Sequence, residues 1–311
     1  MPSRSERLFA ALAERGADAF ISGDRPNQLY LLDHPDPSTV ISRPNCAAVV
    51  FAASETVVFP GIWISYACRD MLENCEVVAN EKGDSPPVEQ LIERLAKVGY
   101  KKIITDNAGL AEAIGKGVAG TAVEVDDIAR ALRRTKDERD LAGMREAARV
   151  ADLGMSTAFA VIRPGVTCGE VIAEGTSAML KAGAESVAMA PAAGVGTYYL
   201  DSGEDPRRVI AEGDMVFIDM GIWVHGYLGD ITRAGIVGEG SAVQRDLLKT
   251  VQEAYTLGSQ AMVPGADGKV IYQSVVDHFA AKGWDKYYVH HLSHGLGLTL
   301  AARRLVENAV P

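Results

Sequence analysis

The segment from Met215 to Val237 constrains this chain more than any other part of its sequence. It reads as two apolar strands joined by a turn at residues 225–226, and each strand carries an aspartate. With a two-residue loop, Asp219 faces Thr232, and Asp230 lies diagonally from Asp219 on the same face. Carboxylates this close repel each other, so one takes up a proton or a cation lies between them. A hard divalent cation suits carboxylate oxygens; the alternative is a hairpin with solvated carboxylates.

Composition limits the class of protein and its partners. The 311 residues are 48% hydrophobic and 23% charged, which is typical of a soluble globular protein with two domains. A net charge of −10 argues against nucleic acid and anionic membranes as partners. The four cysteines show no paired short spacing, which favours a reduced setting. We therefore expect a cytoplasmic protein with neither nucleic-acid nor membrane partners.

The first part of the chain alternates strand and helix patterns. Residues 17–22, 47–51 and 102–105 are strand-like, whereas residues 88–98 place apolar side chains at helical spacing. This alternation predicts a small α/β layer domain. Residues 126–157 then become helical and densely charged, and we expect two helices here with a break near Thr135, which has Glu138 at the spacing of a capping box. The domain junction is expected at this break.

The second part contains a weak internal repeat. The tripeptides at residues 163–165 and 263–265 both end in Pro-Gly and both precede an amphipathic helix, predicted at 168–182 and 271–282. Duplicated halves would place a site at their interface. Between them, residues 188–203 read as a Gly/Ala-rich loop.

A histidine cluster stands near the end of the chain. His290, His291 and His294 supply three of the six histidines, and Gly295 and Gly297 follow them. Imidazole is the commonest metal ligand and a proton shuttle near neutral pH. No glutamate follows His290, so this is not an HExxH zinc helix. The alternative is a His-rich loop without a ligand role.

Four motifs together resemble one family. The chain contains DMG, GDITR and HHLSHGLGL in this order, and residues 24–34 (DRPNQLYLLDH) and 132–152 (LRRTKDERDLAGMREAARVAD) are similar to two further family segments. The pattern resembles the creatinase/aminopeptidase P branch of the pita-bread (M24) metallopeptidases, which includes Xaa-Pro aminopeptidases and prolidases. The resemblance implies an α+β protein with an N-terminal α/β creatinase-like domain, residues 1–132, and a pita-bread catalytic domain, residues 133–311.

The resemblance also implies a site and a reaction. Asp219 would bind one metal ion, Asp230 would bridge two, His294 would bind the second, and His290 would be an accessory catalytic histidine. The cofactors would be two divalent ions, with manganese first and cobalt or zinc as alternatives. The reaction would be metal-dependent hydrolysis of Xaa-Pro bonds in short proline-containing peptides, carried out by a homodimer.

The sequence also departs from the family pattern. Two glutamate ligands that family members carry after the histidine have no counterpart, and Pro311 follows His294 by 17 residues. We therefore expect a C-terminally truncated form of such an enzyme, with an incomplete pita-bread domain and impaired hydrolysis. Two alternatives are a hydrolase on the same fold that acts on a small amide or amidine, and a catalytically inactive binding module.

Overall fold

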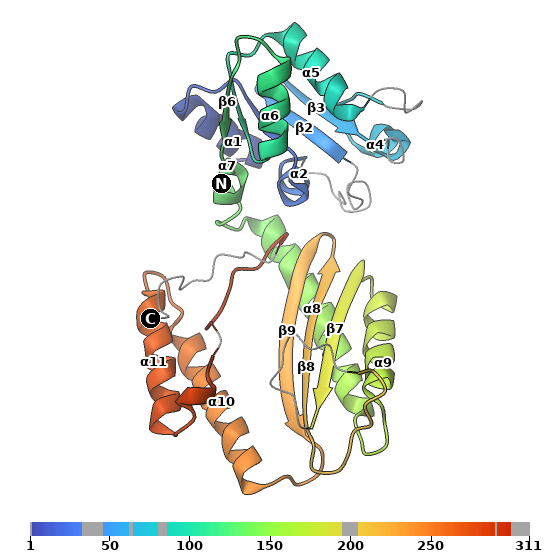
Figure 1. Ribbon diagram of the computed structural model, residues 1–311, viewed down its shortest axis with the longest axis vertical. Helices are drawn as coiled ribbons and strands as arrows, with labels where there is room; N and C mark the ends of the chain where they lie inside the picture. The colour runs from blue at the N-terminus through green and yellow to red at the C-terminus, as the bar shows by residue number, and fades with distance from the viewer. Residues whose placement is uncertain are drawn as a thin grey trace. The chain divides into compact units, whose positions relative to one another are not determined.

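The chain forms two compact units, Met1–Leu141 and Ala142–Pro311 (Figure 1). The computed structural model describes residues 2–32, 46–61, 65–79, 86–194, 205–289 and 291–299. Residues 133–141, which the sequence pattern assigns to the second domain, lie with the first unit. Within the described residues, no helix is long and apolar enough to cross a bilayer.

The first unit is built on a six-stranded sheet in the order β4-β3-β2-β1-β5-β6. The central strand β1 is wholly buried and pairs antiparallel with β2 and parallel with β5. The α/β layer expected from the alternating pattern is therefore confirmed. The strands are β1 (Ala19–Ser22), β2 (Cys46–Ala52), β3 (Glu55–Pro60), β4 (Glu76–Val77), β5 (Lys102–Thr105) and β6 (Ala122–Val125), and the described helices are α1 (Arg4–Glu14), α2 (Arg25–Leu32), α4 (Ser65–Met71), α5 (Pro87–Val98), α6 (Ala108–Gly117) and α7 (Ile128–Leu132).

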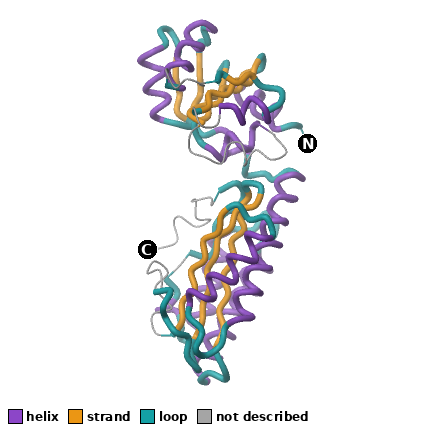
Figure 2. Tube along the Cα trace, turned by 90° about the vertical axis from the view of Figure 1, so that its right-hand side faces the viewer, coloured by secondary structure: helices purple, strands orange, loops and turns teal. Residues whose placement is uncertain are grey.

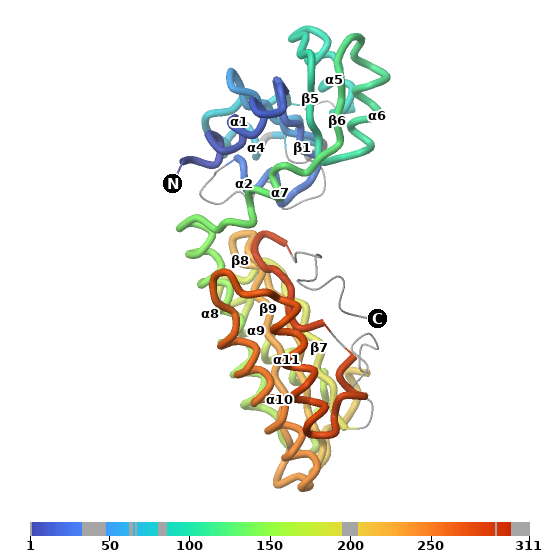
Figure 3. Tube along the Cα trace, turned by 90° about the vertical axis from the view of Figure 1, so that its left-hand side faces the viewer, coloured from blue at the N-terminus to red at the C-terminus, as the bar shows by residue number. Residues whose placement is uncertain are grey.

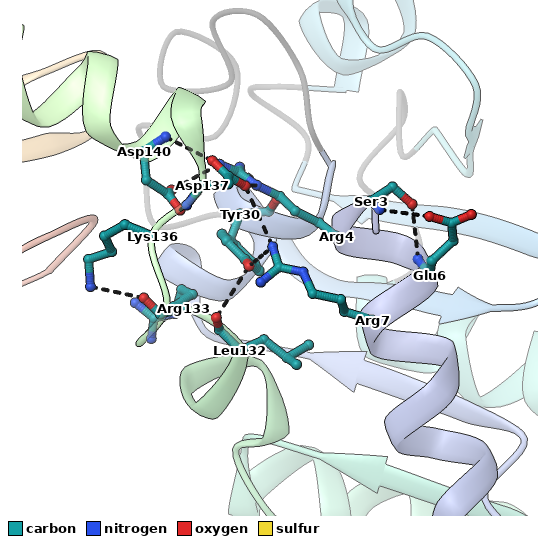
Figure 4. A network of polar contacts seen from close by, with 10 residues as sticks. All are labelled: Ser3, Arg4, Glu6, Arg7, Tyr30, Leu132, Arg133, Lys136, Asp137 and Asp140. Atoms are coloured by element: carbon teal, nitrogen blue, oxygen red, sulfur yellow. Dashed lines mark hydrogen bonds and ion pairs between the residues drawn. The ribbon is translucent and has the colours of Figure 1, made fainter. Parts of the chain in front are cut away.

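A buried arginine ties residues 137–140 to the first unit (Figure 4). Arg4 donates to both carboxylate oxygens of Asp137, at 2.7 and 3.0 Å, and to Asp140 at 2.9 Å. Its guanidinium also lies over the Tyr30 ring, 4.3 Å from the centroid. The Arg4 hydrogen bonds hold the pKa of Asp137 well below its usual range. This network explains why the segment before residue 142 packs with the N-terminal helices.

The same two aspartates begin the next helix, α8 (Glu138–Val161). The Asp137 side chain accepts from the Asp140 amide at 2.9 Å, and the Asp140 side chain accepts from the Asp137 amide at 3.0 Å. The helix break near Thr135 is confirmed, but the expected cap was two residues too early. Aspartate caps a helix as well as threonine does, and here Arg4 also pairs with the capping carboxylate.

The second unit places two helices over one face of a three-stranded antiparallel sheet, β7-β8-β9. Helices run alongside these strands in Figure 2. On β8, buried and partly exposed residues alternate, so that Ile218, Met220 and Ile222 face the core formed with α8 and α9. The elements after α8 are α9 (Cys168–Lys181), β7 (Ser186–Ala193), β8 (Met215–Val224), β9 (Tyr227–Ile236), α10 (Ala242–Ala261), α11 (Gly268–Ala281) and the short 3₁₀ helix η2 (Asp285–Tyr287).

The expectation of a loop from residue 188 was wrong for its first part, because Ser186–Ala193 forms β7. Its small side chains and Pro191 lack the β-branched signature of a strand. In the described residues β7 pairs only with β8, and an edge strand tolerates a proline because one row of its backbone groups needs no partner. Tertiary pairing therefore overrides local propensity here.

The internal repeat is confirmed as a duplicated helix pair. α8 ends at Val161 and α9 begins at Cys168, while α10 ends at Ala261 and α11 begins at Gly268. In both connections the glycine of the Pro-Gly dipeptide has a positive φ, 92° at Gly165 and 83° at Gly265. The same turn thus reverses the chain in each pair, since glycine adopts this conformation without a steric penalty.

Replacing Gly229 with alanine tests the close packing of α8 on β9. A Cβ atom at Gly229 would lie 2.7 Å from the Ala147 carbonyl oxygen, and backbone cannot move aside as a side chain can. We expect Gly229→Ala to lower the free energy of unfolding by about 1–3 kcal/mol. Gly221→Ala is the control, because its Cβ would make only ordinary contacts from 3.6 Å. Equal urea midpoints for both variants would contradict this packing.

Replacing Arg4 with methionine tests the buried network of the first unit. Removing the guanidinium takes the shortest ion pairs from Asp137 and Asp140 and leaves Asp137 with the more distant Arg7, at 3.5 Å, which costs about 3–5 kcal/mol. Because the folded pKa of Asp137 is depressed, its contribution is full above its unfolded pKa of about 3.9 and is lost as pH falls below that value. Urea unfolding between pH 7 and pH 2 should therefore show a shallower acid limb in Arg4→Met. The exposed pair of Lys116 and Glu112 provides the control, since Lys116→Met should cost less than about 1 kcal/mol.

Candidate metal centre

The two aspartates lie on one face of the β8–β9 hairpin, as the sequence predicts. Asp219 pairs with Thr232 and Asp230 pairs with Gly221, so the carboxylates are diagonal neighbours. The turn lies at residues 225–226, both of which have positive φ, 50° and 78°. This geometry is that of a two-residue hairpin turn, which fixes the register of both strands.

Thr232 holds the first aspartate. Its hydroxyl donates to Asp219 Oδ1 at 2.6 Å across the strand pair. The bond leaves the other carboxylate oxygen of Asp219 for a ligand and limits the rotation of the side chain. Tyr227, at the start of β9, lies elsewhere: its ring packs against Gly143 of α8, on the core side of the sheet.

His294 reaches the second aspartate from a distant part of the sequence. Its Nε2 atom lies 3.6 Å from Asp230 Oδ2, and the two side chains are 28% and 26% exposed. Burial raises the pKa of the Asp230 carboxyl, the charge of Asp219 raises it further, and His294 opposes this rise. The Asp230 carboxylate is thus partly buried, and a nearby positive charge would stabilise its ionised form.

A backbone contact holds the segment that carries His294 against β9. The Leu228 amide donates to the Gly297 carbonyl at 2.8 Å, and Leu298 packs against the core of the second unit. This segment, dark red in Figures 1 and 3, runs toward the hairpin end of β8 and β9. His291 lies beside it, with its ring 5.7 Å from that of His294. His290 lies outside the described residues.

The donor set fits a divalent cation. Asp219 and Asp230 supply hard oxygens and His294 supplies a nitrogen, a combination that suits manganese, cobalt or zinc. Burial, and to a smaller extent the charge of Asp219, raises the pKa of Asp230, and a bound cation would oppose both effects. In the described residues no group of three or more His, Cys, Asp or Glu side chains is already closed to the spacing of a metal site.

A pocket near the hairpin is separate from this centre. It has a volume of about 470 Å³ and is lined by α8 and β9, including Phe159, Ile231 and Arg233. None of Asp219, Asp230 and His294 lines it. It lies between helix and sheet and contributes no ligand to the centre.

Comparison with known proteins places the second unit in a family. The sequence model of metallopeptidase family M24 matches residues 142–308, more than half of the chain, and the chain belongs to this family. It is 33% identical over 178 residues to an uncharacterized peptidase, YqhT, of Bacillus subtilis, covering 57% of this chain and 50% of that protein. It is 31% identical over 176 residues to a Xaa-Pro dipeptidase of Pyrococcus horikoshii, covering 56% and 50%. The chain thus spans about half the length of these curated relatives.

Solved structures confirm the fold over both units. An X-Pro aminopeptidase from Thermotoga maritima superimposes with a TM-score of 0.83 at 23% identity, covering 96% of this chain and 83% of that one. A Xaa-Pro dipeptidase from Bacillus anthracis gives a TM-score of 0.82 at 23% identity, covering 96% and 82%. The expected α+β architecture of the pita-bread group is therefore confirmed.

Proposed function

We propose that this protein is a divalent-metal-dependent peptidase that cleaves Xaa-Pro bonds in short peptides. The observation that carries the proposal is the arrangement of Asp219 and Asp230 on one hairpin face with His294 3.6 Å from Asp230. The relatives named as Xaa-Pro dipeptidases support the choice of substrate. A hydrolase acting on a small amide has no comparable support among them.

Asp219, Asp230 and His294 would hold the metal. They would hold two divalent ions, manganese first, and His290 would be the accessory catalytic histidine. Such ions polarise a scissile carbonyl and acidify a water molecule. The chain's own residues supply the orientation: Thr232 fixes Asp219, and the hairpin register keeps both carboxylates on one face.

The first unit would be the creatinase-like domain. Homodimers would form through this unit, and the protein would work in the cytoplasm. The net charge of −10 supports small peptides over nucleic acid as the partner.

Metal binding by the purified chain tests the centre. We expect titration calorimetry to show binding of Mn²⁺ or Co²⁺. Loss of an outer hydrogen-bond partner lowers metal affinity by up to about 100-fold, so Asp219→Ala, which removes a ligand, should lower it by more than that. Asp152→Ala is the matched control, since Asp152 lies on α8 in the same unit and away from the centre.

With Mn²⁺ added, an Xaa-Pro dipeptide should be hydrolysed and an Xaa-Ala dipeptide should not. No metal uptake by the intact chain, together with an unchanged Asp219→Ala variant, would refute the proposal, whereas metal uptake without hydrolysis would favour the binding-module alternative.

Thr232→Val tests the orientation of Asp219. Valine keeps the shape of the side chain but cannot donate to Asp219 Oδ1, so the affinity for Co²⁺ should fall about 10–100-fold. Thr232→Ser should restore most of it. Thr256→Val on α10 is the control, because that hydroxyl bonds only to the helix carbonyl of Gln252. An unchanged affinity in Thr232→Val would show that the hydrogen bond does not orient the ligand.

A further inference from the structure

An aromatic cluster lies at the end of the second helix pair. The ring of Phe279 on α11 stacks on Tyr288, with centroids 4.8 Å apart and an interplanar angle of 16°. The ring of Tyr272, two turns earlier on the same face of α11, has its centroid 6.0 Å from that of Tyr288. Burial raises the pKa of Tyr288 to about 12. Tyr288 is therefore packed against α11, although it lies beyond the end of that helix.

Leu292, two residues after residue 290 in the sequence, belongs to the same cluster. It packs with Ala254 of α10 and with Val275 and Phe279 of α11. The neighbouring Tyr287 and Val289, by contrast, are 63% and 90% exposed. The chain after α11 is therefore attached to the helix pair through Tyr288 and Leu292, while Tyr287 and Val289, on either side of Tyr288, face solvent.

His294 follows Leu292 by two residues and lies between two anchors. Before it, Leu292 is packed between α10 and α11. After it, Gly297 accepts the Leu228 amide of β9 and Leu298 packs into the core. Residues 293–297 include two glycines, which would leave a free chain with many backbone conformations. The anchors restrict that freedom on both sides of the imidazole.

We propose that Tyr288 and Leu292 are positioning residues that hold His294 beside Asp230 through their packing on the α10–α11 pair. The inference rests on the proposed function for the role of His294 as a ligand. The expected effect on the structure does not require bound metal. Loss of the Tyr288 ring should release the segment that carries His294 from α11 and weaken the Leu228–Gly297 hydrogen bond at the other end of that segment.

The test compares Tyr288→Ala with Tyr287→Ala in the full chain. Without metal, amide hydrogen exchange at Leu228 should become about 10-fold faster in Tyr288→Ala and change less than about 2-fold in Tyr287→Ala. Tyr288→Phe keeps the stacked ring and should behave as the parent. The Co²⁺ affinity should follow the same order, with a loss of about 10-fold in Tyr288→Ala.

Exchange at Ile218, in the centre of β8, separates local release from general unfolding. If the exchange rate of the Ile218 amide rises by the same factor, the milder variant Leu292→Val is measured in place of Tyr288→Ala. The inference then requires that Leu292→Val raise the exchange rate at Leu228 and leave the rate at Ile218 unchanged. An exchange rate at Leu228 in Tyr288→Ala equal to that of the parent overturns the inference, regardless of the Co²⁺ affinity. Absence of Co²⁺ binding by the parent chain counts against the proposed function only, because the exchange arm still decides the positioning role.

Discussion

The register of the β8–β9 hairpin is the constraint on which the arrangement of Asp219 and Asp230 depends. The turn at residues 225–226 sets a register in which both carboxylates share one face of the sheet. A slip of one residue would send one of them into the apolar core around Ile218, so the register is strongly specified. The fold thus keeps two like charges near each other, and the raised pKa of Asp230 reflects its burial first and the charge of Asp219 second.

The sequence predicts this half of the centre well and the other half poorly, for physical reasons. Hairpin register follows from local turn chemistry and alternation, so Asp219 opposite Thr232 is predictable without any tertiary information. The distance from Asp230 to His294 depends on packing between segments more than 60 residues apart, and no local pattern reports it. The edge strand β7 escaped prediction because its pairing with β8, and not its own composition, makes it a strand.

The two helix pairs support different parts of the candidate metal centre. α8 and α9 pack under the strands that carry the aspartates, with Gly229 allowing β9 to approach the α8 backbone. α10 and α11 support the segment that carries His294, through the smaller cluster around Phe279. The same helix–turn–helix unit therefore serves once as a platform for a sheet and once as an anchor for a chain segment.

This difference in support determines how metal binding and order are coupled. The aspartates are fixed by a ladder of hydrogen bonds that spans the hairpin. In the described residues, the segment that carries His294 is instead held by the Leu228–Gly297 hydrogen bond, by the packing of Leu298 and by a small apolar cluster. Contacts of the second kind open at lower free energy than a sheet does. An ion shared by Asp230 and His294 would bind the closed arrangement in preference to the open one and would so stabilise it by mass action. By the same linkage, every contact that favours the closed segment without metal would raise the affinity for the ion. The packing of Tyr288 and the hydrogen bond at Leu228 would then act on the proposed centre without touching the metal, because they would reduce the entropic cost of ordering the segment on binding.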